Sequence, residues 1–320
     1  MRALLLLASA GALAGCETLA YYGQAAAGQL AISAQARPVA QVLADADVAP
    51  VLKERLRLAS ELRDYAVRVL KLPDSGAYRS YADLERPYAL WNVVAAPEFA
   101  LEPVQSCFPI AGCVAYRGYF DRSGAERHGA ARRADGYDVV VYGVPAYSTL
   151  GWFDDPLLST FIDYPDAELA RLLFHELAHQ VAYVKDDSSF NESFAVVVER
   201  EGLRRWRGVP AAAHRREFEE LVLGLRSKLR ALYASRLAPD EMRRRKREAL
   251  EALRPWLERM RGFESVEPSN AVLASFGTYT QKVPAFERLL AEAGGDLERF
   301  YARVRELALL PRAERDARLR

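Results

Sequence analysis

The clearest periodic pattern of the chain lies between residues 166 and 184, where apolar side chains recur at a spacing of three and four. The apolar positions of this stretch are Leu169, Leu172, Leu173, Leu177 and Val181. Such spacing predicts a helix with one face buried in a core. Pro165 suits the first helical turn, and Asp166 and Glu168 complement the positive end of the helix dipole.

The predicted helix carries the motif H-E-x-x-H at His175, Glu176 and His179. Residues four apart lie one above the other on one helical face, so both imidazoles can bind the same metal ion. Glu176 would then face an adjacent bound water. A chance arrangement on a buried helix is the alternative, although this motif contains two of the four histidines in the chain.

A third metal ligand is available at Glu192, because catalytic zinc sites usually take three protein ligands plus water. Glu192 follows a short polar loop at 185–189 and begins a second predicted helix. The alternative is a capping box from Ser189 to Glu192, in which the carboxylate serves only the helix N-terminus. Glu199 lies seven residues later on the same face, either as a carboxylate that orients a ligand histidine or as an ordinary surface residue.

Outside this region the pattern divides the chain into a helical start, a strand-rich middle and a helical end. Helical spacing covers 19–72, with interruptions at Pro38 and Pro50. Helical spacing returns after residue 211. The predicted strands and the short helix between the last two span 88–95, 114–120, 137–144 and 123–134. The fold class expected from this order is α+β.

The N-terminus reads as a secretory signal that ends in a lipid-attachment site. Arg2 precedes an apolar stretch at 3–14, which is too short to span a membrane. The following Leu13-Ala14-Gly15-Cys16 resembles a bacterial lipobox, in which Cys16 would be lipidated and become the mature N-terminus. An ordinary signal peptide with an incidental cysteine is the alternative. Glu17, in place of Asp, resembles outer-membrane sorting, so we expect a periplasm-facing lipoprotein.

Charge argues against nucleic acid as a partner. The chain has 44 basic and 43 acidic residues, and the only charged residue before Cys16 is Arg2, so the mature chain would be neutral. A basic run at 243–247 could contact anionic lipid or nucleic acid, but the acidic residues around it favour a solvated helix. No specific protein partner is predicted.

Two further cysteines, Cys107 and Cys113, are close in the sequence. In an oxidising periplasm such a pair predicts a disulfide that closes the intervening loop. Metal ligation by the two thiolates is the alternative, although the H-E-x-x-H site needs no cysteine.

His175, Glu176 and His179, followed by Asn191 and Glu192, resemble the gluzincin metallopeptidases, in which a glutamate on the next helix completes the zinc site. More widely, the chain resembles a family of predicted bacterial zinc aminopeptidase lipoproteins. That wider resemblance rests on residues 107–120, 145–153, the two metal helices and 270–286. It implies a peptide substrate and one Zn²⁺ ion. The Gly-x-Met-Glu-Asn stretch of well-known gluzincin aminopeptidases does not occur in this sequence.

The resemblance also implies a zincin-like core in which a small mixed sheet backs the metal helix. In that plan an edge strand pairs with extended substrate, and we place 137–147 along this edge. Tyr147 would line the cleft, with Asp154 and Asp155 near its mouth as candidates for binding a substrate ammonium. In related gluzincins a C-terminal Tyr or His stabilises the oxyanion, and Tyr279 with Asn270 is the candidate pair. A simple packing role for Tyr279 is the alternative.

These observations predict a zinc metallopeptidase in which Glu176 transfers protons and His175, His179 and Glu192 hold the metal. An endopeptidase acting on envelope proteins, a hydrolase of peptidoglycan peptides, and a metal-bound lipoprotein without activity remain alternatives. The expected segments are a signal peptide, a helical N-terminal segment, a catalytic core and a helical C-terminal region, at 1–15, 16–85, 86–207 and 208–320.

Overall fold

The computed structural model describes residues 2–108, 112–149, 152–208 and 213–319. The side chains of residues 2–18, 213 and 214 lie outside this description. The predicted lipid attachment at Cys16 therefore falls on a side chain that the structure does not describe. Among the described residues, no helix combines the length and the apolar character needed to cross a membrane.

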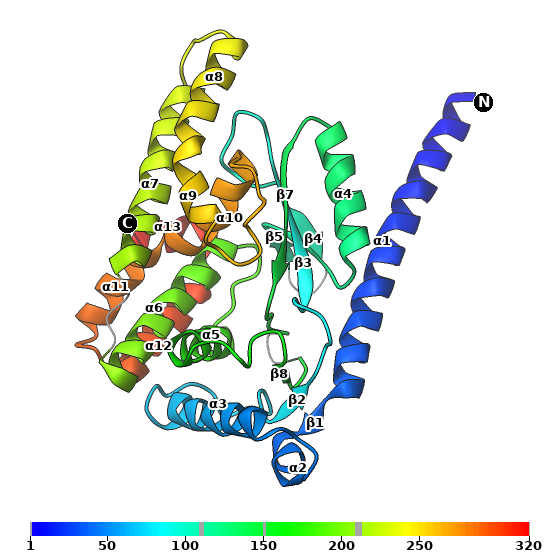
Figure 1. Cartoon of the computed structure of the whole chain (residues 1–320). Helices are drawn as coiled ribbons and strands as arrows, with labels where there is room; N and C mark the ends of the chain where they lie inside the picture. The colour runs from blue at the N-terminus through cyan, green and yellow to red at the C-terminus, as the bar shows by residue number, and fades with distance from the viewer. Residues whose placement is uncertain (1, 109–111, 150–151, 209–212, 320) are drawn as a thin grey trace.

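The fold is mixed α+β and mostly helical, as the sequence predicts (Figure 1). The N-terminal helices are α1 (Arg2–Gln35), α2 (Val39–Ala44) and α3 (Pro50–Arg68). The strands are β1 (Arg37–Pro38), β2 (Ser80–Ala82), β3 (Leu90–Ala96), β4 (Ser106–Phe108), β5 (Gly112–Val114), β6 (Arg117–Tyr119), β7 (Asp138–Val144) and β8 (Leu157–Leu158). The later helices are α4 (Arg122–Ala134), α5 (Asp166–Ala178), α6 (Ser188–Arg207), α7 (Ala213–Tyr233), α8 (Pro239–Leu250), η1 (Glu251–Leu253), α9 (Arg254–Leu257), α10 (Asn270–Thr280), α11 (Val283–Glu292), α12 (Leu297–Ala308) and α13 (Arg312–Arg318).

The largest described sheet has the order β6-β3-β7, and both of its strand pairs are antiparallel. The long pair joins Leu90 to Val144 at one end and Ala96 to Asp138 at the other. Helices α4 and α10 both contact this sheet. The sheet is therefore not mixed as expected. A parallel pair occurs instead between β2 and β8, in the smaller sheet β1-β2-β8.

Helix α6 is the central helix of the metal-site region, because α5, α10 and α11 all pack against it. Helix α5 also packs against α3, whose buried face presents Leu56, Ala59, Leu62 and Ala66 at helical spacing. Since two helices cover α5 closely, the apolar side chains in the middle of α5 are inaccessible to water. Leu169, Leu173 and Phe174 are fully buried.

Two elements differ from their predicted bounds: the strand at 114–120 is divided, and the helix at 166–184 ends early. The 114–120 run is two strands, because β5 pairs with β4 in a hairpin whereas β6 pairs with β3. The helix predicted to reach residue 184 ends at Ala178. Gln180 and Val181 donate to carbonyls only three residues back, at Leu177 and Ala178, which tightens the last turn and redirects the chain.

The apolar core crosses the chain segments predicted from the sequence. One cluster runs from Ile32 through α3, α5 and α6 to Leu307, and a second joins β3, β7 and helices α7 to α10. The N-terminal segment, the metal helices and the C-terminal helices therefore share buried surface. The segment boundaries themselves stay a prediction.

Candidate metal centre

Helix α5 places His175 and Glu176 in its last turn, and His179 is its C-terminal cap. Both histidines are 7% exposed. The helix ends six residues earlier than expected, but His179 keeps helical backbone angles, so the four-residue spacing still presents both imidazoles on one face. Their ring centroids are 5.0 Å apart.

Glu192 reaches these histidines from the first turn of α6. The N-terminal cap of α6 is Asp187, whose carboxylate accepts a hydrogen bond from the Phe190 N–H at 3.0 Å. The alternative capping box between Ser189 and Glu192 is therefore wrong, since Asp187 serves the helix end. The Asn191 side chain bonds both the N–H and the carbonyl of Val184, at 2.7 and 2.9 Å, which fixes the loop against α6.

His175, His179 and Glu192 form a group that could hold a metal ion. Their candidate ligand atoms all lie within 4.8 Å of one another. Glu192 Oε2 lies 3.1 Å from His175 Nε2 and 3.7 Å from His179 Nε2. Tetrahedral ligands about 2.0–2.2 Å from a zinc ion stand roughly 3.4 Å apart, so the separations suit one such cation.

Electrostatics in the centre also fit a cation. Burial lowers the pKa of His179 to about 4, which keeps this ring neutral and able to donate a lone pair. Burial also lowers the pKa of His175, but hydrogen bonds to Glu192 and Glu199 outweigh it and raise the value to about 10. The carboxylates therefore favour positive charge at the position that the ligand atoms surround.

Glu199 orients the first histidine. Its Oε2 lies 2.9 Å from His175 Nδ1, which leaves Nε2 directed at Glu192. Burial raises the pKa of Glu199, but the Arg171 guanidinium and His175 outweigh this and lower it to about 2. Arg171 donates to Glu199 at 3.2 Å and to Glu168 at 2.9 Å. Glu199 is thus a buried, ionised carboxylate within a network of charges rather than a surface residue.

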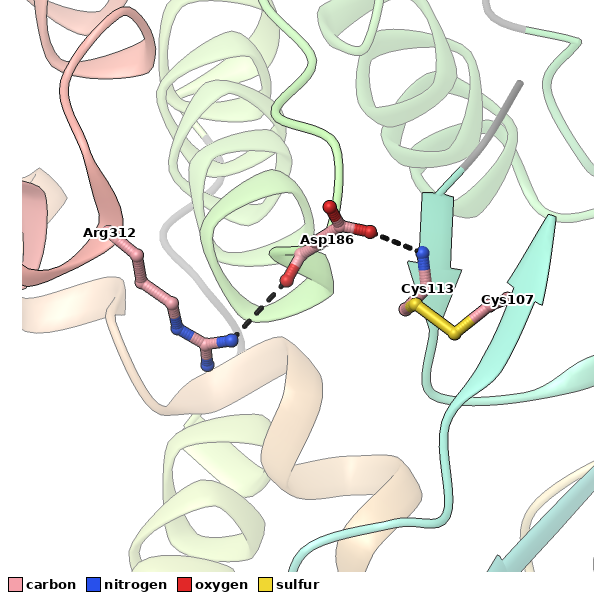
Figure 2. Close-up of a disulfide and its surroundings, with 4 residues drawn as sticks. All are labelled: Cys107, Cys113, Asp186 and Arg312. Carbon is pink, nitrogen blue, oxygen red and sulfur yellow. Dashed lines mark hydrogen bonds between the residues drawn. A yellow bond between two sulfur atoms is a disulfide. The ribbon is translucent and has the colours of Figure 1, made fainter. Parts of the chain in front are cut away.

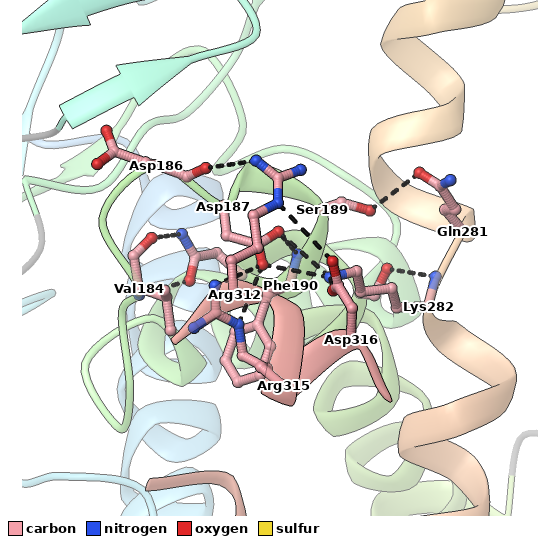
Figure 3. A network of polar contacts seen from close by, with 12 residues as sticks. Val184, Asp186, Asp187, Ser189, Phe190, Gln281, Lys282, Arg312, Arg315 and Asp316 are labelled. Atoms are coloured by element: carbon pink, nitrogen blue, oxygen red, sulfur yellow. Dashed lines mark hydrogen bonds and ion pairs between the residues drawn. The ribbon is translucent and has the colours of Figure 1, made fainter. Parts of the chain in front are cut away.

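The loop between α5 and α6 is held from the far end of the chain by α13 (Figure 3). Arg315 donates to Asp187 Oδ2 through Nε at 3.1 Å and Nη2 at 2.9 Å. Lys282 also pairs with Asp187, at 3.2 Å, and with Asp316. Asp187 is 2% exposed, so both cations stabilise a buried charge at the start of the helix that carries Glu192.

Glu176 lines a cavity of about 510 Å³ together with the three candidate ligands. Burial raises the pKa of the Glu176 carboxyl to about 7. Tyr279 lines the same cavity, and its ring centroid lies 6.1 Å from that of His175. The Glu192 charge, and then burial, raise the pKa of Tyr279 well above its ordinary value, so its hydroxyl stays a donor at neutral pH.

The disulfide predicted between Cys107 and Cys113 joins paired positions of the β4–β5 hairpin. This hairpin supplies Phe108 and Val114 to the cavity wall. Asp186 connects the hairpin to the loop between α5 and α6, because the Asp186 side chain accepts a hydrogen bond from the Cys113 N–H at 2.5 Å (Figure 2). The Asp186 carbonyl accepts from Arg312 of α13 at 3.4 Å, so the hairpin, the loop and the C-terminal helix meet at one residue.

Three predicted site residues lie away from the cavity lining. Asn270 is fully buried at the start of α10, where its side chain bonds the carbonyls of Pro97 and Glu98. It therefore ties α10 to the end of β3 rather than supporting Tyr279. Asp154 is exposed beside Gly76. Asp155 is 4% exposed and accepts from the Thr149 N–H at 2.8 Å, so it lies inside the protein and not at the cleft mouth.

The predicted substrate edge at 137–147 is covered at two of its positions, Gly143 and Pro145. Strand β7 is an outer strand of its sheet and Tyr147 lines the cavity, as expected. However, a Cβ built on Gly262 would lie 3.2 Å from the Gly143 carbonyl oxygen, so the chain after α9 packs directly on this strand. The Pro145 carbonyl accepts from Thr160 Oγ1 at 2.5 Å.

Several cavity residues were missed by sequence reasoning because they come from distant elements. Tyr116, Tyr183 and Asn92 line the cavity with Tyr279. Asn92 Oδ1 is buried and has no hydrogen-bond partner among the described residues, while the Asn92 amide bonds the Tyr142 hydroxyl. Nothing in the sequence distinguishes these residues from other aromatic and polar positions of strands. Only the pairing of β3 with β6 and β7 brings Asn92 to the metal helices.

Comparison with known proteins gives one family. Residues 20–319 match the model of a family described as "Putative aminopeptidase". No curated protein and no solved structure matches the chain. Because the match covers nearly the whole chain, including all three candidate ligands, the chain belongs to this aminopeptidase family.

Proposed function

We propose that the protein is a zinc-dependent metallopeptidase with a zincin-like site, and that it removes residues from the amino end of peptides. The observation that carries the proposal is the joint position of Glu176, Tyr279 and the three candidate ligands on one cavity. Family membership supports a peptide substrate. Two histidines and a carboxylate form a donor set that zinc commonly takes in hydrolases.

His175, His179 and Glu192 would hold the zinc ion, and Glu199 would keep His175 in the tautomer that directs Nε2 at the metal. A zinc ion bound there would supply Lewis-acid chemistry for activating water and polarising the scissile carbonyl. Asp187 caps α6 through the Phe190 N–H and is itself held by Arg315, so it keeps Glu192 in place by fixing the start of this helix.

Glu176 moves the protons of the reaction. Its carboxyl has a pKa of about 7, so near neutral pH it can accept a proton from water and return it to the leaving amine. Tyr279 remains protonated and can donate its O–H to the carbonyl oxygen as negative charge develops there. Both side chains are only partly exposed to solvent, which strengthens these interactions.

Aminopeptidase action requires acceptors for the free amino group of the substrate. Asn92 lines the cavity, and its Oδ1 is a buried acceptor that faces Gly118 and has no partner among the described residues. An unsatisfied buried acceptor costs about 1–3 kcal/mol, which a substrate N–H would recover once the Asn92 side chain turns toward the cavity. We therefore assign Asn92 to this role in place of Asp154 and Asp155.

The membrane anchor is part of the proposal. Lipidation at Cys16 would tether the catalytic domain to the periplasmic side of the outer membrane, as the lipobox-like sequence suggests. Globomycin treatment of expressing cells, followed by measurement of the N-terminal mass, tests this step. A diacylated Cys16 supports the anchor, whereas cleavage elsewhere or no acyl mass contradicts it.

The test of the enzyme is metal content followed by peptide hydrolysis. We expect about one zinc per chain by elemental analysis of the domain without its anchor, and loss of zinc in His179→Ala. Zinc-loaded protein should cleave peptides with a free amino terminus and leave N-acetylated ones intact. Cleavage of the acetylated peptides would identify an endopeptidase, and absence of zinc from the wild-type protein would contradict the proposal.

A further inference from the structure

Helix α1 forms one wall of the cavity that contains the candidate metal centre. Tyr21, Tyr22, Ala25 and Gln29 lie at helical spacing along one side of α1 and line the same cavity as Glu176. In Figure 1 this helix runs along the sheet side of the molecule, and its N-terminal part extends past α4. The segment that leads to the predicted anchor is therefore also part of the cavity.

The Gln24 side chain connects α1 to the outer edge of β6. Its amide makes the hydrogen bonds to the main chain that a neighbouring strand would otherwise make. Gln24 Oε1 accepts from the Phe120 N–H at 3.0 Å, and Gln24 Nε2 donates to the Gly118 carbonyl at 3.5 Å. Gly28 lies directly on the Phe120 ring, since a Cβ at this position would come within 2.1 Å of it. The Tyr147 hydroxyl also donates to Gln29 Oε1.

An extended peptide therefore finds neither edge of the β6-β3-β7 sheet free at these positions. Gln24 takes the polar groups of Gly118 and Phe120 on one side. The chain at Gly262 covers Gly143 on the other side. Strand addition depends on unpaired main-chain groups along an edge, so a peptide must be held here by its side chains and termini.

Apart from Gln29, the side chains that α1 presents to the cavity are aromatic or apolar. Tyr21 stacks on Phe108 at 5.2 Å between ring centroids, and Tyr22 lies edge-on to the same ring at 6.2 Å. Among the described lining residues, the only carboxylates are Glu176 and Glu192, and there is no Lys or Arg. Both carboxylates belong to the metal centre. The exposed Trp152 and Phe153 extend the apolar lining to the surface.

We propose that α1 forms the specificity pocket of the enzyme and selects peptides that carry a bulky apolar side chain next to the scissile bond. The expected effect on kcat/KM rests on the proposed peptidase activity, whereas the expected preference in peptide binding does not require turnover. A cavity of about 510 Å³ lies within the range of small-ligand sites, so it accommodates a short peptide.

Two substitutions on neighbouring positions of α1 test the proposal. Ala25→Leu adds apolar volume inside the cavity, whereas Ala26→Leu makes the same change at an exposed position of the same helix. Trileucine and trialanine are the probes, because a uniform peptide gives the same result whichever side of the scissile bond the pocket serves. Zinc content and thermal unfolding of each variant serve as controls for folding.

Wild-type protein should prefer trileucine in kcat/KM. Ala25→Leu should lower kcat/KM for trileucine at least about tenfold and leave trialanine within about twofold, since hydrophobic pockets discriminate by about 10- to 200-fold per methylene. Ala26→Leu should change neither value. Equal effects on both peptides, or no effect of Ala25→Leu, would overturn the inference.

If neither peptide is cleaved, calorimetric titration into the zinc-loaded proteins decides the inference separately from the proposed function. Tighter binding of trileucine than trialanine, lost in Ala25→Leu and kept in Ala26→Leu, supports the pocket although hydrolysis has failed. No binding of trileucine, or equal binding of both peptides by the wild-type protein, overturns it.

Discussion

The helix pair α5–α6 and the wall made by α1 and the sheet border the same cavity, but different forces hold their side chains. On the α5–α6 side, Glu199 and Asp187 are buried charges that pair with Arg171 and Arg315. On the α1 side, aromatic surfaces are in contact, and the Gln24 amide makes a polar connection to the sheet edge.

Because of this difference, we expect changes on the α5–α6 side to affect catalysis and changes on the α1 side to affect substrate preference. Removing one member of a buried charge cluster leaves its partner without compensation, so the α5–α6 side tolerates little change. Apolar contacts are individually weak and adapt to substitution, so the α1 side can change shape while the metal centre stays intact. Variants on the two sides should therefore affect different measurements.

The largest expected effect is on catalysis at the charged side. Glu176→Gln removes the proton acceptor while keeping the shape of the side chain, so kcat should fall about 10²- to 10⁴-fold. Zinc content should stay at the wild-type level, because Glu176 is outside the ligand group. Steady-state kinetics and elemental analysis on the same preparation check both statements. Retained activity in this variant would exclude Glu176 as the base.

The next effect is on stability and comes from α13. Arg315→Met leaves the buried Asp187 with Lys282 alone, and we expect a loss of about 3 kcal/mol in the free energy of unfolding. Arg312→Met on the same helix removes an exposed side chain whose one hydrogen bond to this loop, to the Asp186 carbonyl at 3.4 Å, is long, and the change should cost less than about 0.5 kcal/mol. Urea titrations of both variants measure the free energy of unfolding. Equal losses of this free energy would show that α13 does not hold the loop between α5 and α6 through Asp187.

Glu199→Gln should weaken metal binding without abolishing it. The amide keeps a hydrogen bond to His175 Nδ1 but loses the charge that makes the ring a better ligand, and such changes reduce metal affinity about 10- to 100-fold. Competition with a chromogenic zinc chelator measures the ratio. An affinity equal to wild type would place Glu199 in a packing role only.

Asp155 predicts a pH dependence of stability that is independent of the metal. Burial raises the pKa of this carboxyl from 3.8 to about 6, so the folded protein binds the proton more tightly than the unfolded chain does. Stability from this group is therefore full below pH 3.8 and is lost as the pH rises through about 6.

Asp155→Asn removes this dependence. Between pH 4 and pH 8, the variant should gain about 2 kcal/mol in unfolding free energy relative to wild type, measured by urea titration of the metal-free proteins. A constant difference between the two proteins across this range would mean that the carboxyl is not held in a raised-pKa environment.

The smallest expected effect is on stability and comes from the contact between α1 and β6. Gln24→Leu removes the two hydrogen bonds to β6, which together should cost about 1 kcal/mol, while the aromatic contacts of α1 remain. Hydrogen exchange of the Phe120 amide should become faster in this variant and stay unchanged in Gln35→Leu, where the glutamine is exposed. Unchanged protection of the Phe120 amide in Gln24→Leu would show that Gln24 does not fasten the wall.

Local sequence alone determined the elements that carry the candidate metal ligands. The spacing of His175 and His179 depends only on helix periodicity, and Glu192 follows after a loop short enough to bring the second helix back. The close cysteine pair likewise predicted its own disulfide. These features could be predicted because they arise from contacts between residues near one another in the chain.

Only the tertiary structure decided the contacts between distant segments. Arg315 reaches Asp187 across more than a hundred residues, and Gln24 reaches Phe120 at a similar separation. Asn270 and Asp155 were assigned to the site from sequence, yet Asn270 is buried where α10 meets the carbonyl of Glu98, and Asp155 is buried where it accepts from the Thr149 N–H. The physical reason is that periodicity reports which face of an element is buried, whereas the partner of that face depends on how all the elements pack together.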